Sequence, residues 1–217
     1  MKILAMTDIH GSYSTAAAIL RDEPADVVII GGDLTTVGTV KEAEEALDLL
    51  QAAGGRIFCV AGNMDLPQHD DLFEKRGVSL NARGVRIGDF GFFGVSAAPY
   101  SKLHTPYELS EDELSRRIHK GYQMIKDSPR TIFVPHAPPY GTRLDIIHSG
   151  IHVGSTAVRD FIEDKQPDLV ICGHIHEARG VDNIDNTKVV NCGTASQGNY
   201  ARITIGEEIE IKNLHHR

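Results

Sequence analysis

The sequence predicts a mixed α/β fold built around two β-sheets, and three observations support this. In the first third of the chain, short apolar runs alternate with helical segments, which is the pattern of parallel strands joined by helical crossovers. In the middle and towards the C-terminus, turn residues separate the short apolar runs instead, which is typical of antiparallel strands. Roughly ten strands are expected in all, and a single small open sheet rarely holds so many.

The first third of the chain predicts three strands and two helices. An alanine-rich helix is expected over residues 14–20. A second helix begins after Thr39, which forms a capping box with Glu42, and it ends at Gly54. The strands are apolar runs, typical of strands buried on both faces, and are expected over residues 2–6, 27–30 and 57–60.

The remaining two thirds predict two further helices and several short strands. Ser110 and Glu113 form another capping box, and apolar residues follow at helical spacing as far as Ile125. A last helix is expected over residues 156–165, after a loop over 137–154 that is rich in proline and glycine. The tail predicts an antiparallel meander. Strands are expected over residues 85–87, 90–95, 131–134 and 169–172, and in the tail over 189–191, 201–205 and 208–211.

The composition is that of an ordinary globular protein. The 217 residues are 41% hydrophobic and 24% charged, which excludes collagen-like and disordered chains and predicts one domain over residues 1–217. A formal net charge of −8 disfavours broad binding to nucleic acid or acidic membranes. No stretch approaches the ~20 apolar residues of a membrane span, and the first residues lack the apolar segment of a secretory signal. We therefore expect a cytoplasmic protein, and the sequence leaves open whether it forms a homo-oligomer.

The three cysteines are predicted to be structural. Cys59, Cys172 and Cys192 each lie at or near the end of an apolar run, and three are too few for a disulfide framework. We expect each to be a small buried side chain near a strand end. One basic cluster in the first half of the chain is interpreted as solvated surface, and it comprises Lys75, Arg76, Arg83 and Arg86.

Polar side chains of a recurring kind follow each predicted parallel strand. In α/β sheets, ligands bind in the crevice beyond the carboxyl ends of the strands, so these side chains are expected to meet there. Asp8 and His10, like His174 and His176, are two residues apart, and in extended backbone both members of such a pair project from the same side. The full set comprises Asp8, His10, Asp33, Asn63, Asp65, His136, His174 and His176.

This set of side chains predicts a transition-metal site. Carboxylate, imidazole and amide groups together suit Mn²⁺, Fe²⁺, Zn²⁺ or Co²⁺ better than Ca²⁺ or Mg²⁺, which prefer oxygen alone. Without Asp65, the set contains seven ligand candidates, which are too many for one ion that keeps open positions. They suit two ions that share a bridging carboxylate.

Five short motifs resemble those of the calcineurin-like metallophosphoesterases. They are Asp-Ile-His-Gly, Gly-Gly-Asp-Leu, Gly-Asn-Met-Asp, Pro-His-Ala-Pro-Pro and Gly-His-Ile-His, in that order within residues 3–176. The resemblance implies two facing mixed β-sheets flanked by helices, an α-β-β-α sandwich. It also implies two divalent metal ions, for which Mn²⁺ is the first candidate and Fe, Zn, Co and Ni are alternatives. By the resemblance, one ion would be bound by Asp8, His10, Asp33 and His176, and the other by Asp33, Asn63, His136 and His174.

The same resemblance implies hydrolysis of a phosphoester by in-line attack of a hydroxide that bridges the two ions. Asn63 and Asp65 would belong to the catalytic centre, with Asp65 orienting a neighbouring group or a water. Met64 stands where the family usually has a histidine, and it has no proton to give. A subgroup similar to this chain also lacks that histidine and tends towards phosphodiesters, so a phosphodiesterase is expected. His148 and His152 are the candidates for a replacement acid.

Alternatives stay open at this point. A phosphomonoesterase or a nucleotide pyrophosphohydrolase of the same fold would share the metal ligands, because specificity lies in the loops. A non-enzymatic binding scaffold is a third reading, and the presence of all seven ligand-type residues argues against it. The expected partner is a small phosphorylated substrate, not nucleic acid or a membrane. Arg143 is a candidate anchor for its phosphate.

Overall fold

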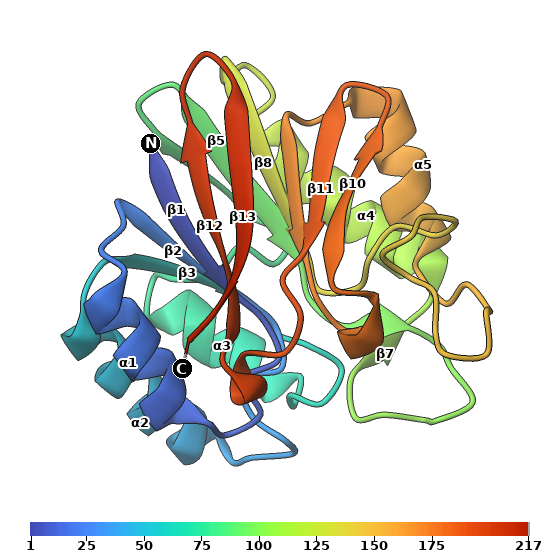
Figure 1. Cartoon of the computed structure of the whole chain (residues 1–217). Helices are drawn as coiled ribbons and strands as arrows, with labels where there is room; N and C mark the ends of the chain where they lie inside the picture. Colours follow the sequence, from blue (N-terminus) through green and yellow to red (C-terminus); the bar gives the residue numbers. More distant parts are fainter. Residues whose placement is uncertain (217) are drawn as a thin grey trace.

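The computed structural model describes residues 1–216 and shows two large β-sheets packed face to face, with helices on both outer sides (Figure 1). One sheet has five strands in the order β13 (Ile209–His215), β12 (Asn199–Ile205), β1 (Lys2–Met6), β2 (Val27–Gly31) and β3 (Arg56–Val60). The other has six in the order β10 (Gly180–Ile184), β11 (Thr187–Asn191), β9 (Leu169–Cys172), β8 (Arg130–Pro135), β5 (Phe90–Val95) and β4 (Gly84–Ile87). A separate short pair consists of β6 (Ala98–Pro99) and β7 (Glu108–Leu109).

Five α-helices cover the outer faces of the two sheets in the described part of the chain. They are α1 (Tyr13–Asp22), α2 (Val40–Ala53) and α3 (Gln68–Lys75) on the five-stranded sheet, and α4 (Glu111–Gln123) and α5 (Thr156–Lys165) on the six-stranded sheet. This confirms the α-β-β-α sandwich that the resemblance implied. The predicted caps are also present, because the side chains of Thr39 and Ser110 accept hydrogen bonds from the backbone N–H three residues later.

The core consists of three apolar layers, which follow from the alternation of side chains along each strand. In β1, Ile3 and Ala5 pack between the sheets, whereas Leu4 and Met6 pack under the helices. Both faces of β1 are therefore buried, as its uninterrupted apolar run predicts. Because β1, β2 and β3 run parallel in one sheet and β5, β8, β9 and β11 in the other, their carboxyl ends form continuous edges.

The prediction for the C-terminal tail was wrong. The strands of the tail divide between the two sheets instead of forming one meander. β11 pairs parallel with β9 and antiparallel with β10, whereas β12 and β13 form a hairpin that pairs with β1. The sequence analysis also missed β10, whose two apolar residues are separated by Asp182 and Asn183, and α3, which has no capping side chain and only one adjacent apolar pair, Leu72 and Phe73.

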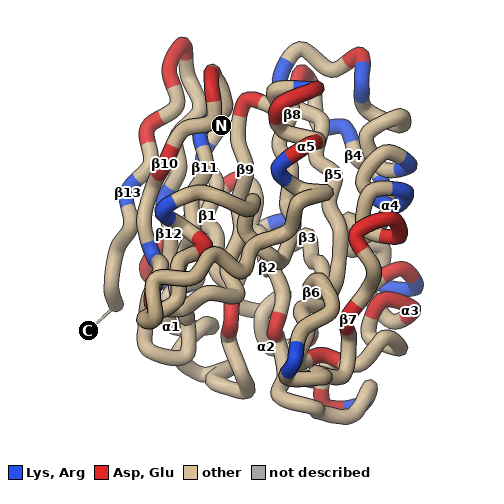
Figure 2. Tube along the Cα trace, turned by 90° about the vertical axis from the view of Figure 1, so that its right-hand side faces the viewer, with Lys and Arg blue, Asp and Glu red and all other residues tan. Residues whose placement is uncertain are grey.

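Acidic and basic residues lie close together along the backbone of α3 and α4 (Figure 2). Within the predicted basic cluster, Arg76 contacts Glu44 and Asp48, Arg83 contacts Glu74, and Arg86 lies 3.7 Å from Asp127. These pairs support the interpretation as solvated surface. None of the helices formed by residues 1–216 has the length and apolar character needed to cross a bilayer.

The three cysteines are buried and free. Burial raises the pKa of each thiol, which disfavours the reactive thiolate. Cys172 donates a hydrogen bond to the carbonyl of Val190 on the neighbouring strand. These observations agree with a structural role for all three.

Candidate metal centre

The predicted ligands come together where the carboxyl ends of strands from both sheets meet. Asp8 and His10 follow β1, Asp33 follows β2, Asn63 follows β3, His136 follows β8, and His174 and His176 follow β9. Two hydrogen bonds join the sheets at this place. His136 Nδ1 lies 2.9 Å from the carbonyl oxygen of Gly31, and the backbone N–H of His174 donates to Asp8 Oδ2 at 3.1 Å.

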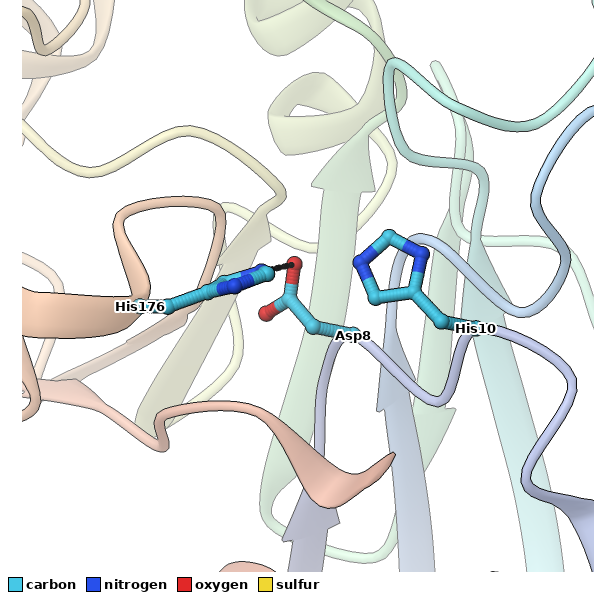
Figure 3. A group of neighbouring side chains, drawn as sticks. All are labelled: Asp8, His10 and His176. Carbon is cyan, nitrogen blue, oxygen red and sulfur yellow. Dashed lines mark ion pairs between the residues drawn. The ribbon is translucent and has the colours of Figure 1, made fainter. Parts of the chain in front are cut away.

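One group of three side chains comprises Asp8, His10 and His176, and their ligand atoms lie within 4.8 Å of one another. In Figure 3 the two imidazole rings lie on either side of the Asp8 carboxylate, and His176 Nε2 is 3.2 Å from Asp8 Oδ1. The side chain of Asp8 is fully buried, whereas 42% of the side-chain surface of His176 is exposed. This group therefore opens to solvent on the His176 side.

A second group comprises Asp8, Asp33 and His136, all buried. Asp8 belongs to both groups, and Asp33 also connects the second group to the first, because its Oδ2 atom is 3.7 Å from His10 Nε2 and 3.6 Å from His136 Nε2. The remaining two predicted ligands lie against His136. Asn63 Oδ1 is 3.0 Å from His136 Nε2, and the His174 ring meets the His136 ring edge-on at 5.1 Å between centroids.

The hydrogen bonds of His136 prepare it for a cation. A carbonyl can only accept, so Nδ1 carries the proton that bonds to Gly31 and Nε2 is directed into the site. Nε2 faces Asn63 Oδ1 and Asp33 Oδ2, two oxygen atoms that accept hydrogen bonds or bind a cation. A divalent cation would be held by all three atoms when Nε2 offers its lone pair. His10 resembles this arrangement, with Nδ1 on the Thr36 hydroxyl at 2.9 Å and Nε2 towards Asp33.

The titration of the buried groups agrees with a cation site. Burial raises the pKa of Asp8, but the hydrogen bond with His176 and nearby imidazoles lower it, so that it ends at about 2. Burial raises the pKa of Asp33 to about 7, and the negative charges of Asp8 and Asp65 act in the same direction. Burial also lowers the pKa of His174 to about 3, with help from His136. Imidazole and carboxylate groups gathered in a buried site are the donor set expected for divalent metal ions.

The backbone of the ligands departs from the sequence prediction. Asp8 and His10 are not in extended backbone, because their φ angles are 57° and 49°. Asp33 and His174 also have positive φ, at 49° and 67°. Asp8 and His10 come together because both have left-handed backbone. His174 lies against His136 of the second group, whereas His176 belongs to the first group. Such backbone costs on the order of 1–3 kcal/mol per residue and is concentrated at functional sites.

Two glycines allow the chain to approach the carboxylates. A Cβ atom on Gly62 would overlap the carboxylate and backbone nitrogen of Asp33, and one on Gly173 would overlap the Asp8 carboxylate and Thr7. Any side chain at these positions would displace a ligand. The glycines of the motifs are therefore part of the site geometry.

Comparison with known proteins decides the family. The sequence matches the family described as calcineurin-like phosphoesterase over residues 1–178. The chain belongs to the calcineurin-like phosphoesterase family. This confirms the resemblance that the five motifs indicated, and it makes the protein a metal-dependent phosphoesterase in which the clustered carboxylates and imidazoles are the candidate ligands for divalent metal ions.

Individual relatives agree with this assignment. An uncharacterized protein of Methanocaldococcus jannaschii is 33% identical over 88% of this chain and 87% of its own length. A probable cyclic nucleotide phosphodiesterase of Synechococcus sp. is 26% identical over 82% of this chain and 74% of its own length. The crystal structure of a dimetal phosphatase from Danio rerio shares the fold, with a TM-score of 0.66 at 12% identity and coverage of 98% and 95%.

In this phosphoesterase, Asp65 connects the loops that carry two predicted ligands. It is fully buried and accepts hydrogen bonds from the backbone N–H groups of Leu34, Thr35 and Gly62, and from the Thr35 hydroxyl. It thereby fixes the turn after Asp33 to the turn before Asn63. Sequence reasoning missed its buried neighbour His69, whose Nδ1 is 3.4 Å from Asp65 Oδ1. The i,i+4 spacing of these two residues was the available signal, but α3 had not been predicted.

Asn63 is also held from the opposite side, by a residue that the sequence analysis did not consider. The backbone N–H of Tyr107 donates to the carbonyl of Asn63 at 3.0 Å. The hydroxyl of Tyr107 donates to the half-buried carboxylate of Asp70 at 2.6 Å and accepts from Arg117 at 2.7 Å. This network connects the Asn63 turn to α3 and α4.

A cavity of about 940 Å³ adjoins the predicted metal site, and Asn63 and His174 form part of its wall. His152 also lines it, with Nδ1 2.7 Å from the fully buried carboxylate of Asp145. His148, by contrast, is 89% exposed beside Glu177, and it is not among the residues lining the cavity.

Arg143, the candidate phosphate anchor, pairs with Asp182 on β10 at 3.1 Å and also lies outside the cavity wall. Of the loop residues singled out from the sequence, only His152 is therefore brought to the same cavity as predicted metal ligands.

Proposed function

We propose that the protein is a phosphodiesterase that uses two divalent transition-metal ions. Mn²⁺ is the first candidate for both ions, and Fe, Zn, Co and Ni are the alternatives. Asp8, His10 and His176 would hold one ion, Asn63, His136 and His174 the other, and Asp33 would bridge them. The position of Asp33 Oδ2 carries this proposal, because it is nearly equidistant from His10 Nε2 and His136 Nε2.

Two bound ions supply an activated water as nucleophile and offset the negative charge of the phosphoryl oxygens. The chain itself orients the ligands. Gly31 and Thr36 hold the imidazoles of His136 and His10 with Nε2 directed towards Asp33. Asp65 accepts hydrogen bonds from the backbone of Thr35 and Gly62, and it thereby holds the turn after Asp33 and the turn before Asn63 together. A separate group must protonate the departing alkoxide, because Met64 carries no proton.

We assign this proton transfer to His152. The Asp145 carboxylate accepts a hydrogen bond from Nδ1, so Nε2 is the atom of His152 that can exchange a proton with a bound substrate. Asp145 is itself fixed by the backbone N–H groups of Gly141, Thr142 and Gly154, so the ring has a defined orientation. A carboxylate that orients an imidazole beside a reaction site is a recurrent arrangement in acid–base catalysis.

Three observations favour a diester over a monoester or a pyrophosphate. A monoester carries a second negative charge, and the side chain of Met64 supplies neither a positive charge nor a proton to offset it. Lys102 is the only lysine or arginine among the described residues lining the cavity, and a pyrophosphate would need more. One relative is a probable cyclic nucleotide phosphodiesterase. The partner is then a small phosphodiester, and we propose the cytoplasm as the location of the reaction because all three cysteines are free.

A substrate panel with added Mn²⁺ tests the proposal. Bis(4-nitrophenyl) phosphate should be hydrolysed with a higher kcat/KM than 4-nitrophenyl phosphate, and purified protein should contain two metal ions per chain. A preference for the monoester, or for a nucleoside diphosphate derivative cleaved at its pyrophosphate, would contradict the diester assignment. Absence of turnover with both metal sites filled would favour the binding-scaffold alternative.

The role of His152 requires a leaving-group comparison. His152→Gln should lower kcat for a diester with an alkoxide leaving group by roughly 10²-fold or more, whereas a nitrophenolate departs without protonation and should be affected little. His148→Gln is the matched control, because it changes a histidine of the same loop that is exposed to solvent. Equal losses for both leaving groups in His152→Gln would refute the assignment.

A further inference from the structure

We propose that the cavity beside Asn63 and His174 binds an uncharged aromatic ring carried by the phosphodiester. The inference rests on the proposed function, because it concerns the organic part of the same substrate. It assigns a second recognition element to the protein, next to the metal centre and formed by residues that the metal chemistry does not use.

The cavity gathers exposed apolar side chains that would otherwise be scattered. In residues 1–216, nine large hydrophobic side chains are exposed, and four of them line this one cavity. These four are Tyr100, Leu103, Tyr140 and Ile151, and 82% of the surface of Leu103 is accessible. Exposed apolar side chains scattered singly are ordinary, whereas a group of them in a concave wall marks a binding site.

One of the two loops that display these side chains is held in shape by Glu108. This carboxylate accepts hydrogen bonds from the backbone N–H and the hydroxyl of both Ser101 and Thr105. Burial tends to raise the pKa of Glu108, but these hydrogen bonds lower it to about 2. Tyr100 and Leu103 are therefore displayed by a loop whose backbone is hydrogen-bonded to the carboxylate of Glu108.

Asp145 has the same role in the second loop. It accepts from Gly141, Thr142, His152 and Gly154, and the backbone of Ile147 pairs with that of Ile151. Tyr140 and Ile151 are thus fixed on the opposite part of the wall. A binding wall that is already ordered does not lose loop entropy when a ligand enters.

Few charged side chains of the wall are free to pair with a second charged group on the ligand. Glu108 is occupied by its own loop, and Glu111 accepts from the Ser155 hydroxyl and from the backbone of Thr156 and Ala157 at the start of α5. Only Lys102 remains as a cation among the described lining residues. A ligand group that fits this wall is apolar and neutral.

Two tyrosines favour a ring over an alkyl chain. Tyr100 and Tyr140 offer flat faces for aromatic stacking. Polar side chains, among them His104, Thr105 and Thr156, interrupt the apolar wall. An extended chain would need a continuous apolar groove, whereas a ring needs only a local one.

The test compares three phosphonate monoesters of equal charge, methyl methylphosphonate, methyl benzylphosphonate and methyl hexylphosphonate. Their dissociation constants are measured by calorimetry with the full chain, both after chelator treatment and with Mn²⁺ added. We expect the benzyl compound to bind at least ~10-fold more tightly than the methyl compound in both forms, since the ring removes apolar surface from water. The hexyl compound should bind more weakly than the benzyl compound.

Variants locate the site. Tyr100→Ala combined with Leu103→Ala should reduce the benzyl preference by about 5-fold or more. Leu49→Ala is the matched control, because Leu49 is an exposed leucine on α2 outside this cavity. Equal affinities for the methyl and benzyl compounds, tighter binding of the hexyl compound, or an unchanged preference in the double variant would each overturn the inference.

The two proposals fail separately. A ring preference without diester hydrolysis would refute the proposed function and leave the recognition element in place. Diester hydrolysis without a ring preference would refute this inference alone.

Discussion

Replacing Asp33 by asparagine should stabilise the metal-free protein while it abolishes metal binding. Asp33 is almost fully buried between His10 and His136, and Asp8 and Asp65 add negative charge nearby. Without a cation, the ionised carboxylate is therefore unfavourable in the folded state. Asparagine retains the Oδ1 atom that accepts from the backbone N–H of Met64 at 2.7 Å, and it removes the charge.

The size of the effect follows from the pKa of Asp33. Burial raises this pKa from 3.8 to about 7, and each unit corresponds to ~1.4 kcal/mol, so the total is of order 4 kcal/mol. Because the pKa of the folded state is the higher one, the folded protein binds this proton more tightly than the unfolded chain does. The free energy of unfolding of the metal-free protein should therefore fall as the pH rises from about 4 to above 7. Asp33→Asn removes this decline.

The assay is urea unfolding of chelator-treated protein at pH 5 and pH 8, together with the metal content of untreated protein. Asp33→Asn should be more stable than the unmodified protein by about 1.5 kcal/mol at pH 5 and by up to about 4 kcal/mol at pH 8. Metal content should drop below two ions per chain, with a collapse of turnover.

Asp65→Asn provides the contrast. Although burial raises the pKa of Asp65, the His69 imidazole 3.4 Å away and the backbone hydrogen bonds from Gly62 and Thr35 lower it overall, so its ionised form stabilises the fold. The substitution should destabilise the metal-free protein at pH 8, because the stability contributed by this group is present above its unfolded pKa. If Asp33→Asn destabilises the protein as Asp65→Asn does, or retains two metal ions and near-normal turnover, the account of the centre is wrong.

Two further substitutions test the geometry around the centre. Gly62→Ala should reduce metal content and destabilise the protein by about 1–3 kcal/mol, because its Cβ would overlap Asp33. Gly206→Ala is the control and should be close to neutral, because its Cβ would have no neighbour nearer than 3.9 Å. Equal losses of stability for the two variants in urea unfolding would contradict this prediction. Met64→His should raise monoester turnover relative to diester turnover by roughly 10²-fold, measured as kcat/KM on paired nitrophenyl mono- and diesters at fixed Mn²⁺. An unchanged ratio with intact metal content would remove Met64 from the explanation of substrate preference.

Local signals in the sequence were sufficient for most elements. The side chains of Thr39 and Ser110 cap α2 and α4 because the capping interaction needs only residues three apart. Buried strands such as β2 were recognised from uninterrupted β-branched runs. The prediction for the C-terminal tail was wrong because the pairing of its strands is not decided by local signals. Which sheet a short strand joins depends on partners far away in the chain, and β12 pairs with β1 across nearly the whole sequence.

The candidate site likewise has features that the sequence predicts and features that it does not. The types of the ligand residues and their place after strands could be taken from the sequence, because an α/β fold brings the carboxyl ends of its strands to common edges. The conformation of these residues could not. Asp8 and His10 have positive φ, which the alternation argument did not anticipate, and backbone of this kind persists only because surrounding hydrogen bonds hold it.

The sequence by itself thus determined the family, the donor chemistry and the strand ends that carry it, because these depend on residue type and short spacing. Only the tertiary structure placed Asp33 between His10 and His136, since this requires the ends of two separate sheets to meet. The tertiary structure also supplies the reason why we propose His152 and not His148 as the acid. The two histidines are four residues apart in one loop, but His152 lines the cavity and contacts the buried carboxylate of Asp145, whereas His148 is exposed beside Glu177.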